Sequence, residues 1–312
     1  MKRLFCAALL CAGFTGQAMA AQEKTDLLWK RFENTVADTE KNLDGVMGVA
    51  LLDLNTGKQF LLHGDEIFPQ ASSIKITVLA ELYHQSEQAA SGAKGKQKLT
   101  DPYVVQADDI VQDSDIMGGL TPGVTTLTNR DLATMMIAVS DNAATNVLID
   151  RVGMGNVRAL MESLGLPNTQ LRRKMMDLKA ASEGRENIST PREMMTLLEA
   201  LYHGKVLGPK TTEDFFAMLE THKDSWIPAS LPENLKIANK PGALEGVRAD
   251  SGVIFLENRP YVLCVMTSYL GSEKAGEQAI SKISAAAFDL FDRLSRASEY
   301  GRVISVSNGA VR

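Results

Sequence analysis

Ser72 and Lys75 are the residues of this chain whose types and spacing most directly suggest chemistry. They lie in Pro69–Ala80, a segment that is apolar nearly all round and is therefore predicted to be a buried helix. Side chains at i and i+3 share one face of a helix, and burial lowers the pKa of a lysine. A serine beside a base-capable lysine is an activated nucleophile. Ser72 would lie at the helix start, where free N–H groups stabilise a developing anion.

The Ser-x-x-Lys spacing is weak evidence by itself, because about one chance match is expected in a chain of this length. Ser91 and Lys94 match as well, and they lie in a polar loop rich in glycine and lysine. The buried context therefore selects Ser72 as the candidate nucleophile. An unusual structural lysine at position 75 is the alternative interpretation.

Two further polar motifs follow along the chain. The Ser-Asp-Asn triplet at 140–142 comes directly after a predicted helix, and its structural alternative is a cap before a new helix. The Lys-Pro-Gly triplet at 240–242 follows a predicted strand, and a glycine there would let a ligand approach the backbone closely. The structural alternative for this second triplet is a strand that ends in a Pro-Gly turn.

The predicted elements place these motifs between a sheet and a group of helices. Strands are predicted near both ends of the chain, at 46–54, 58–63, 235–239, 249–256 and 261–268. Helical periodicity is found at 26–43, 131–148, 157–164, 191–202 and 278–294. The expected fold is of the α/β (α+β) class: an antiparallel sheet flanked by the terminal helices, with an inserted all-helical lobe. Sites in such proteins often lie in the crevice between the parts.

The first twenty residues have the pattern of a cleaved export signal. Two basic residues precede an apolar run at 4–14, and the small residues at 18 and 20 suit a cleavage site. The run is shorter than the roughly 20 residues that a membrane span needs. We therefore expect an exported, periplasmic protein without a membrane span.

Residues 21–302 are predicted to form a single domain. Its α/β lobe would take in about 25–70 and 230–298, and its helical lobe would take in about 71–229. Residues 303–312 are expected to form a flexible tail.

Composition excludes several classes of protein. The chain has 312 residues, a net charge of −5 and 23% charged residues, so neither disorder nor a basic surface for nucleic acid is expected. Its four histidines are scattered, and only Cys264 of the three cysteines would survive cleavage. Cys264 lies in an apolar strand pattern and is interpreted as a core residue. We expect no metal, no cofactor, no nucleic-acid partner, and a monomer.

In order, the three motifs resemble the signatures of the penicillin-recognising serine hydrolases. The intervals of 68 residues from Ser72 to Ser140 and of 100 residues from Ser140 to Lys240 are close to those of class A β-lactamases. The resemblance covers nearly the whole chain after residue 20. It implies a β-lactamase/transpeptidase-like fold and a small-molecule substrate, either a β-lactam or a cell-wall peptide or acyl ester.

Matching positions carry the catalytic roles of that family onto this chain. The resemblance implies that Ser72 is the acylated nucleophile and that Lys75 is its proton acceptor. Ser140 would pass the proton to the leaving nitrogen, while Lys240 supplies positive charge nearby.

The same resemblance implies the substrate-binding groups. Asn142 would hold the substrate amide. The backbone N–H groups of Ser72 and Ala243, the latter directly after Gly242, would form the oxyanion hole.

One departure from the family concerns the substrate carboxylate. Pro241 replaces a threonine or serine whose hydroxyl normally helps to hold this group. Arg248 could hold a carboxylate with two hydrogen bonds, or it could pair with Asp250 for structure.

A second departure concerns deacylation. Class A enzymes carry a glutamate that activates the deacylating water, and aligning residues 177–179 with their loop puts Met175 at that place. Asp177, Glu183 and Glu186 are the candidates to replace it. Three hypotheses follow: a class A-like serine β-lactamase, a penicillin-binding-type peptidase or esterase with slow deacylation, and a module that captures a ligand without turnover.

Overall fold

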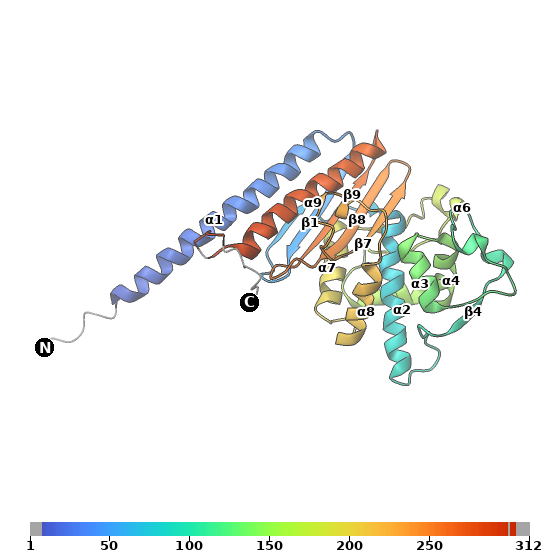
Figure 1. Cartoon of the computed structure of the whole chain (residues 1–312). Helices are drawn as coiled ribbons and strands as arrows, with labels where there is room; N and C mark the ends of the chain where they lie inside the picture. Colours follow the sequence, from blue (N-terminus) through green and yellow to red (C-terminus); the bar gives the residue numbers. More distant parts are fainter. Residues whose placement is uncertain (1–7, 299, 304–312) are drawn as a thin grey trace, which may run out of the picture.

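The computed structural model describes residues 8–298 and 300–303, with side chains from residue 24 onward. It contains a five-stranded antiparallel sheet in the order β2-β1-β9-β8-β7. The strands are β1 (Val46–Asp53), β2 (Gln59–Leu62), β7 (Ile237–Leu244), β8 (Val247–Ile254) and β9 (Tyr261–Ser268). β7 forms one edge of the sheet, and this edge lies next to the helical part of the chain (Figure 1).

Alternate side chains of each strand face opposite sides of the sheet. In β1, Val49 and Leu51 join the core cluster under the terminal helices, whereas Ala50 and Leu52 join the cluster of the helical lobe. Both faces of the sheet are therefore covered, and every residue of β8 and β9 is buried.

The terminal helices α1 (Ala8–Lys41) and α9 (Glu273–Arg296) run side by side along one face of the sheet (Figure 1). Phe291 of α9 packs edge-on against Trp29 of α1, with ring centroids 5.8 Å apart, and stacks on Tyr261 of β9 at 4.4 Å. Such aromatic pairs add about 0.5–1.5 kcal/mol beyond their burial. The opposite face of the sheet is covered by α7 (Pro191–Tyr202).

The inserted lobe is built around α2 (Lys75–Ala90), in which every residue from 75 to 83 is buried, as its apolar pattern predicts. The other helices of this part are α3 (Asn129–Ala138), α4 (Asn142–Val152), α5 (Met154–Ser163), α6 (Leu178–Ser182) and α8 (Pro209–Leu219). The described part of the chain also has 3₁₀ turns: η1 (Ala71–Ile74) directly before α2, η2 (Ala107–Asp109) and η3 (Met117–Gly119) between α2 and α3, and η4 (Pro228–Ser230) between α8 and β7.

Two short ribbons were not predicted. Strand β3 (Phe68–Pro69) pairs with β6 (Ile188–Ser189), and β4 (Pro102–Val104) pairs with β5 (Thr126–Thr128). Strands of two or three residues are too short to show an alternating pattern. The fold class is confirmed, with the addition that the inserted lobe also carries these ribbons.

The two ends of the chain test the terminal predictions only in part. α1 runs through the predicted cleavage site after Ala20, and residues 1–7 lie outside the described residues, so signal cleavage stays a prediction. Among the described residues, no helix has both the length and the apolarity needed to cross a membrane. Of the predicted tail, Val303 forms an isolated bridge with Ala297, and residues 304–312 are not described.

Candidate active site

A cavity of about 290 Å³ lies where β7, η1 and the break between α3 and α4 meet. Six of the eight predicted site residues line it: Ser72, Ser140, Asn142, Lys240, Gly242 and Ala243. The other two do not: Lys75 is fully buried, and Arg248 lies outside the lining. A larger cavity of about 900 Å³, lined by residues between 220 and 239, contains none of the eight.

Ser72 lies in η1, directly before α2. The preceding Ala71 has φ = 46°, a left-handed conformation that costs an alanine roughly 1 kcal/mol and turns the chain sharply into η1. Ser73 N–H donates to Gln70 O at 2.9 Å, and Ser73 Oγ donates to Lys240 O at 3.0 Å. These bonds tie the turn that carries the nucleophile to strand β7.

Gly242 allows β7 to lie directly against η1. A Cβ atom at this position would be 2.4 Å from Gln70 O and 3.0 Å from Ser72 N, both of which are backbone atoms. The backbone of η1 approaches this glycine, and Gly242 also lines the cavity, so the expected approach of a ligand stays a prediction. The close approach brings Ser72 and Ala243 to the same cavity, as an oxyanion pair requires.

Ser140 occupies the break between α3 and α4 and has φ = 60°. Helix α4 begins there because Asp141 accepts the N–H of Ala144 at 3.0 Å. The other oxygen of the same buried carboxylate accepts the N–H of Met117 at 2.9 Å. The triplet therefore forms a helix cap, as its structural interpretation held, and it also places Ser140 at the cavity.

The Ser140 hydroxyl is shared by two buried lysines. Lys75 Nζ lies 2.9 Å from Ser140 Oγ and 2.6 Å from Ser140 O, and Lys240 Nζ lies 3.0 Å from the same Oγ. Asn142 Oδ1 is 3.0 Å from Lys75 Nζ. A hydroxyl that accepts two hydrogen bonds keeps its own proton for a third partner. Ser140 can therefore donate a proton to a group in the cavity.

Burial lowers the pKa of both lysines. For Lys75, burial comes first and the positive charge of Lys240 second, so its pKa lies well below the usual range, although Asp141 opposes the shift. For Lys240, burial and the nearby Lys223 lower the pKa to about 7, against the opposing charge of Asp250. A lysine whose pKa is lowered gives up its proton more readily, and the neutral amine can then accept a proton from another group.

The link from Ser72 to its proposed base is not a direct hydrogen bond. Among the described residues, Ser72 Oγ has no hydrogen-bond partner, and Lys75 contacts Ser140 and Asn142 instead. Catalytic hydrogen bonds often tighten only when substrate binds. The transfer of a proton from Ser72 to Lys75 therefore stays a prediction.

Comparison with known proteins places this arrangement in a family. A sequence model described as the β-lactamase enzyme family matches residues 28–291. The chain belongs to the β-lactamase enzyme family. The β-lactamase OXY-2 of Klebsiella oxytoca is 30% identical over 257 residues, which cover 81% of this chain and 85% of OXY-2. The β-lactamase SME-1 of Serratia marcescens is 27% identical over 303 residues, which cover 93% of this chain and 96% of SME-1.

Solved structures agree with this membership. A β-lactamase from Sphaerobacter thermophilus has 32% identity and a TM-score of 0.75, covering 85% of this chain and 97% of that one. An ancestral class A β-lactamase has 27% identity and a TM-score of 0.75, covering 83% of this chain and all of the other. The chain is thus a class A β-lactamase/transpeptidase-like member of the family.

In this β-lactamase family member, the loop aligned with the deacylating glutamate is held by Asn146. Asn146 lies in α4, one turn beyond Asn142, and its Oδ1 accepts the N–H of Met175 at 2.8 Å. Its Nδ2 donates to Met175 O at 3.0 Å. Met175 is therefore fixed beside α4, and its side chain is buried in the apolar core of the lobe.

The three loop carboxylates that were candidates to replace the glutamate do not line the cavity. Each is engaged elsewhere: Asp177 accepts the N–H of Ala180 at 2.9 Å, Glu183 pairs with Arg185 at 2.6 Å, and Glu186 pairs with Arg173 at 2.9 Å. Their positions in the sequence suggested that one of them activates the deacylating water, but their positions in the fold do not support this role.

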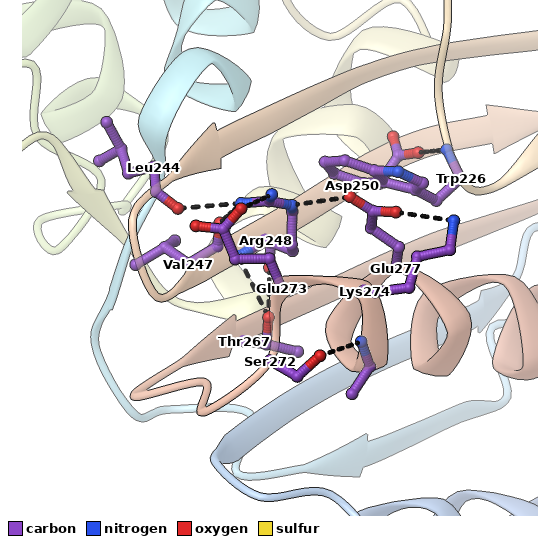
Figure 2. Close-up of polar contacts among 11 residues, drawn as sticks. Trp226, Leu244, Val247, Arg248, Asp250, Thr267, Ser272, Glu273, Lys274 and Glu277 are labelled. Carbon is purple, nitrogen blue, oxygen red and sulfur yellow. Dashed lines mark hydrogen bonds and ion pairs between the residues drawn. The ribbon is translucent and has the colours of Figure 1, made fainter.

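Pro241 and Arg248 were considered in connection with the substrate carboxylate, and the structure does not give either of them a contact suited to holding it. Pro241 lines the cavity and brings no hydroxyl to it. Arg248 does not pair with Asp250, which is buried and accepts two backbone N–H groups from the loop before β7. Arg248 pairs instead with Glu273 and Glu277 of α9 (Figure 2). The proposed Arg248–Asp250 pair is therefore wrong, and Arg248 as a carboxylate ligand lacks support from its position.

Sequence reasoning missed five residues that line the cavity: Val139, Trp226 and the carboxylates Asp113, Asp115 and Asp224. The carboxylates are exposed and have no ion-pair partner in the described part of the chain. They come from two loops that are distant in sequence and form no motif, so only the fold brings them together. In the same described part, no cluster of histidine, cysteine or carboxylate side chains is arranged to hold a metal ion.

Proposed function

We propose that this chain is a serine hydrolase of the class A β-lactamase type, in which Ser72 is acylated by a β-lactam. The observation that supports the proposal most is the hydroxyl of Ser140, which is bonded to both Lys75 and Lys240 at the cavity that Ser72 lines. This arrangement supplies a nucleophile and a proton donor at one cavity, with a base of lowered pKa buried beside the proton donor.

In the first step, Ser72 Oγ attacks the carbonyl carbon of the lactam, and its proton passes to the neutral amine of Lys75. The C–O bond forms while negative charge develops on the carbonyl oxygen. The N–H groups of Ser72 and Ala243 stabilise this oxyanion, and loss of one such donor typically costs about 10²–10³-fold in rate.

In the second step, the C–N bond of the lactam breaks. The hydroxyl of Ser140 gives its proton to the leaving nitrogen, and the Lys75 ammonium, 2.9 Å from Ser140 Oγ, returns a proton to Ser140. Lys240 places positive charge beside the same oxygen and favours the transient loss of its proton. The product is an ester of Ser72, and Lys75 is neutral again.

Hydrolysis of this ester needs an activated water, and here a second candidate function is supported. Met175 is buried and apolar, and no carboxylate of its loop lines the cavity. The acyl-enzyme is therefore expected to persist, as in a penicillin-binding-type peptidase or esterase that acts on cell-wall peptides or acyl esters. In both candidates the substrate is a small acyl donor, and we propose that the chain works as an exported, periplasmic monomer.

Intact-protein mass spectrometry with a penicillin tests the nucleophile. The wild type should gain the mass of one penicillin, Ser72→Ala should gain none, and Ser91→Ala should behave like the wild type. A parallel turnover assay with a chromogenic cephalosporin separates fast hydrolysis from a lasting adduct. Labelling that survives in Ser72→Ala would contradict the assignment of Ser72.

Met175→Glu tests the cause of slow deacylation. A carboxylate introduced at this place is expected to shorten the lifetime of the acyl-enzyme by about 10²–10⁴-fold, which is the usual range for general-base catalysis. Leu178→Glu is the matched control, because it adds the same charge at an exposed position of α6. If the lifetime in Met175→Glu is unchanged while its melting temperature is normal, the water is activated from another side of the cavity.

A further inference from the structure

The buried guanidinium of Arg248 lies at the centre of a polar cluster whose carboxylates are partly exposed (Figure 2). Its Nε is 3.3 Å from Glu277 Oε1, and its Nη2 is bonded to Glu273. Its Nη1 donates to the carbonyl oxygens of Leu244 and Val247, each at 2.9 Å. Four hydrogen bonds thus occupy a group that has five N–H donors.

The charges of this cluster decide what Arg248 can bind. A buried charge costs several kcal/mol unless it is paired, and two carboxylates of α9 already pair with this guanidinium. A substrate carboxylate would have to displace Glu273 or Glu277. The cluster is therefore built to hold Arg248 in place and not to receive an anion.

Two contacts lead from Arg248 to the cavity. Leu244, whose carbonyl Arg248 holds, directly follows Ala243, the proposed oxyanion donor. The guanidinium also lies 5.6 Å from the ring centroid of Trp226, and Trp226 lines the cavity. Arg248 is in addition the cross-strand partner of Ala243 in the β7–β8 ladder.

The backbone of Arg248 is held from the next strand as well. Its N–H donates to Thr267 Oγ1 at 3.1 Å, and Thr267 Oγ1 donates to the carbonyl of Arg248 at 2.8 Å. Strand β9 thus fixes the main chain of Arg248, while the first turns of α9 fix its side chain. The turn between β7 and β8 is attached to both elements through this one residue.

We propose that Arg248, clamped by Glu273 and Glu277, is a positioning residue for acyl transfer: it fixes the turn end of β7 and the indole of Trp226, and it does not hold the substrate carboxylate. The inference rests on the proposed acylation of Ser72. Loss of the Arg248 side chain is expected to lower the rate of Ser72 acylation by the same factor for charged and for neutral substrates.

The test compares a cephalosporin free acid with its methyl ester in the wild type, Arg248→Ala and Arg248→Lys. Arg248→Ala should lower the saturating acylation rate about 10²-fold for both compounds, because a shift of about 1 Å at reacting groups has this cost. The ratio of the acid rate to the ester rate should stay within about twofold of the wild type. Arg248→Lys should recover part of the rate, since it keeps the charge but loses the planar fork of donors.

Arg259→Ala is the matched control. Arg259 pairs with buried Asp53 at 2.6 Å, at the opposite end of the same sheet from Arg248. Its loss should lower the melting temperature in the same way as Arg248→Ala while leaving the acylation rate unchanged. If Arg248→Ala does not fold, Glu277→Gln keeps the test open, because it weakens the clamp and should lower both rates by one common, smaller factor.

The outcomes separate the inference from the function on which it rests. A fall confined to the free acid would show that Arg248 binds the carboxylate, and it would overturn the inference. Unchanged rates for both compounds would overturn it too, because the clamp would then have no effect on the site. If neither compound acylates the wild type, the proposed function fails first, and the inference fails with it.

Discussion

Replacing Gly242 with alanine is expected to push β7 away from η1. The new Cβ would lie 2.4 Å from Gln70 O and 2.7 Å from Ser73 N, closer than the 3.0 Å below which Cβ contacts are essentially never found. Both neighbours are backbone atoms, so neither can rotate away as a side chain would. The strand itself must therefore move.

The size of the effect follows from these distances. An ordinary contact begins at 3.4 Å, so β7 must retreat by about 1 Å at this point. A displacement of about 1 Å at reacting groups can cost about 10²-fold in rate, and overpacking of this kind costs about 1–3 kcal/mol of stability. The N–H of Ala243 would move away from that of Ser72, and the oxyanion would lose one donor.

The assay is the rate of Ser72 acylation by a penicillin, followed by mass spectrometry, together with a melting curve for each variant. Gly155→Ala is the control, because a Cβ at this helical position meets no atom within 4 Å. Gly155→Ala should acylate normally and gain about 0.5–1 kcal/mol of stability. If Gly242→Ala acylates within about twofold of the wild type, the close approach of β7 and η1 does not set the oxyanion site.

Two further predictions concern charge. Burial and the charge of Lys223 lower the pKa of Lys240 to about 7. The acylation rate should therefore fall as the pH rises through this value, because Lys240 loses its positive charge. In Lys223→Gln, a pH–rate profile should show the same fall at higher pH. The unfolded state holds this proton up to about pH 10.4, so the contribution of Lys240 to the free energy of unfolding should rise with pH between these two values. Asp113→Asn and Asp224→Asn should each raise acylation by an anionic β-lactam about twofold at low salt, and the gain should vanish at about 1 M salt. The methyl ester of the same compound should show no such gain.

Parts of the fold could be predicted closely because their signals are local. β9 was predicted at 261–268 and is found there, since an apolar run of this length is typical of a strand buried on both faces. α7 was predicted at 191–202 and is found there, because Thr190 caps it and Pro191 occupies its first turn. Both signals lie within the element itself or next to it.

β7 was predicted too short for a physical reason. The predicted strand ended at residue 239, before Pro241 and Gly242, but the strand continues to Leu244. Proline is excluded from central strands because it lacks an N–H group, and an edge strand tolerates it. The position of β7 at the sheet edge is a property of the whole fold, so its own residues could not reveal it.

In the site, too, some residues could be proposed from local sequence, while others depend on the whole fold. Ser72 and Lys75 could be proposed from the sequence because of their spacing in a buried segment, whereas Ser140 and Lys240 were proposed through the resemblance of the three ordered motifs to a known family. The partners of Arg248 could not be proposed in either way, because Glu273 and Glu277 belong to a helix more than twenty residues further on. The sequence offered Asp250 as the nearer carboxylate, but the fold uses that group to hold backbone N–H groups.

The reactivity of the Cys264 thiol can be used to measure how often the sheet opens. It lies in β9, inside the sheet and fully buried, and burial raises the pKa of its thiol to about 12. If the signal is removed after Ala20, Cys6 and Cys11 leave with it, and Cys264 is the one thiol left in the sequence. A thiol reagent then reacts only with molecules in which β9 is transiently exposed. The rate of labelling therefore measures how often this strand opens under native conditions. Such a chain also matures without an oxidant, because it has no disulfide to form.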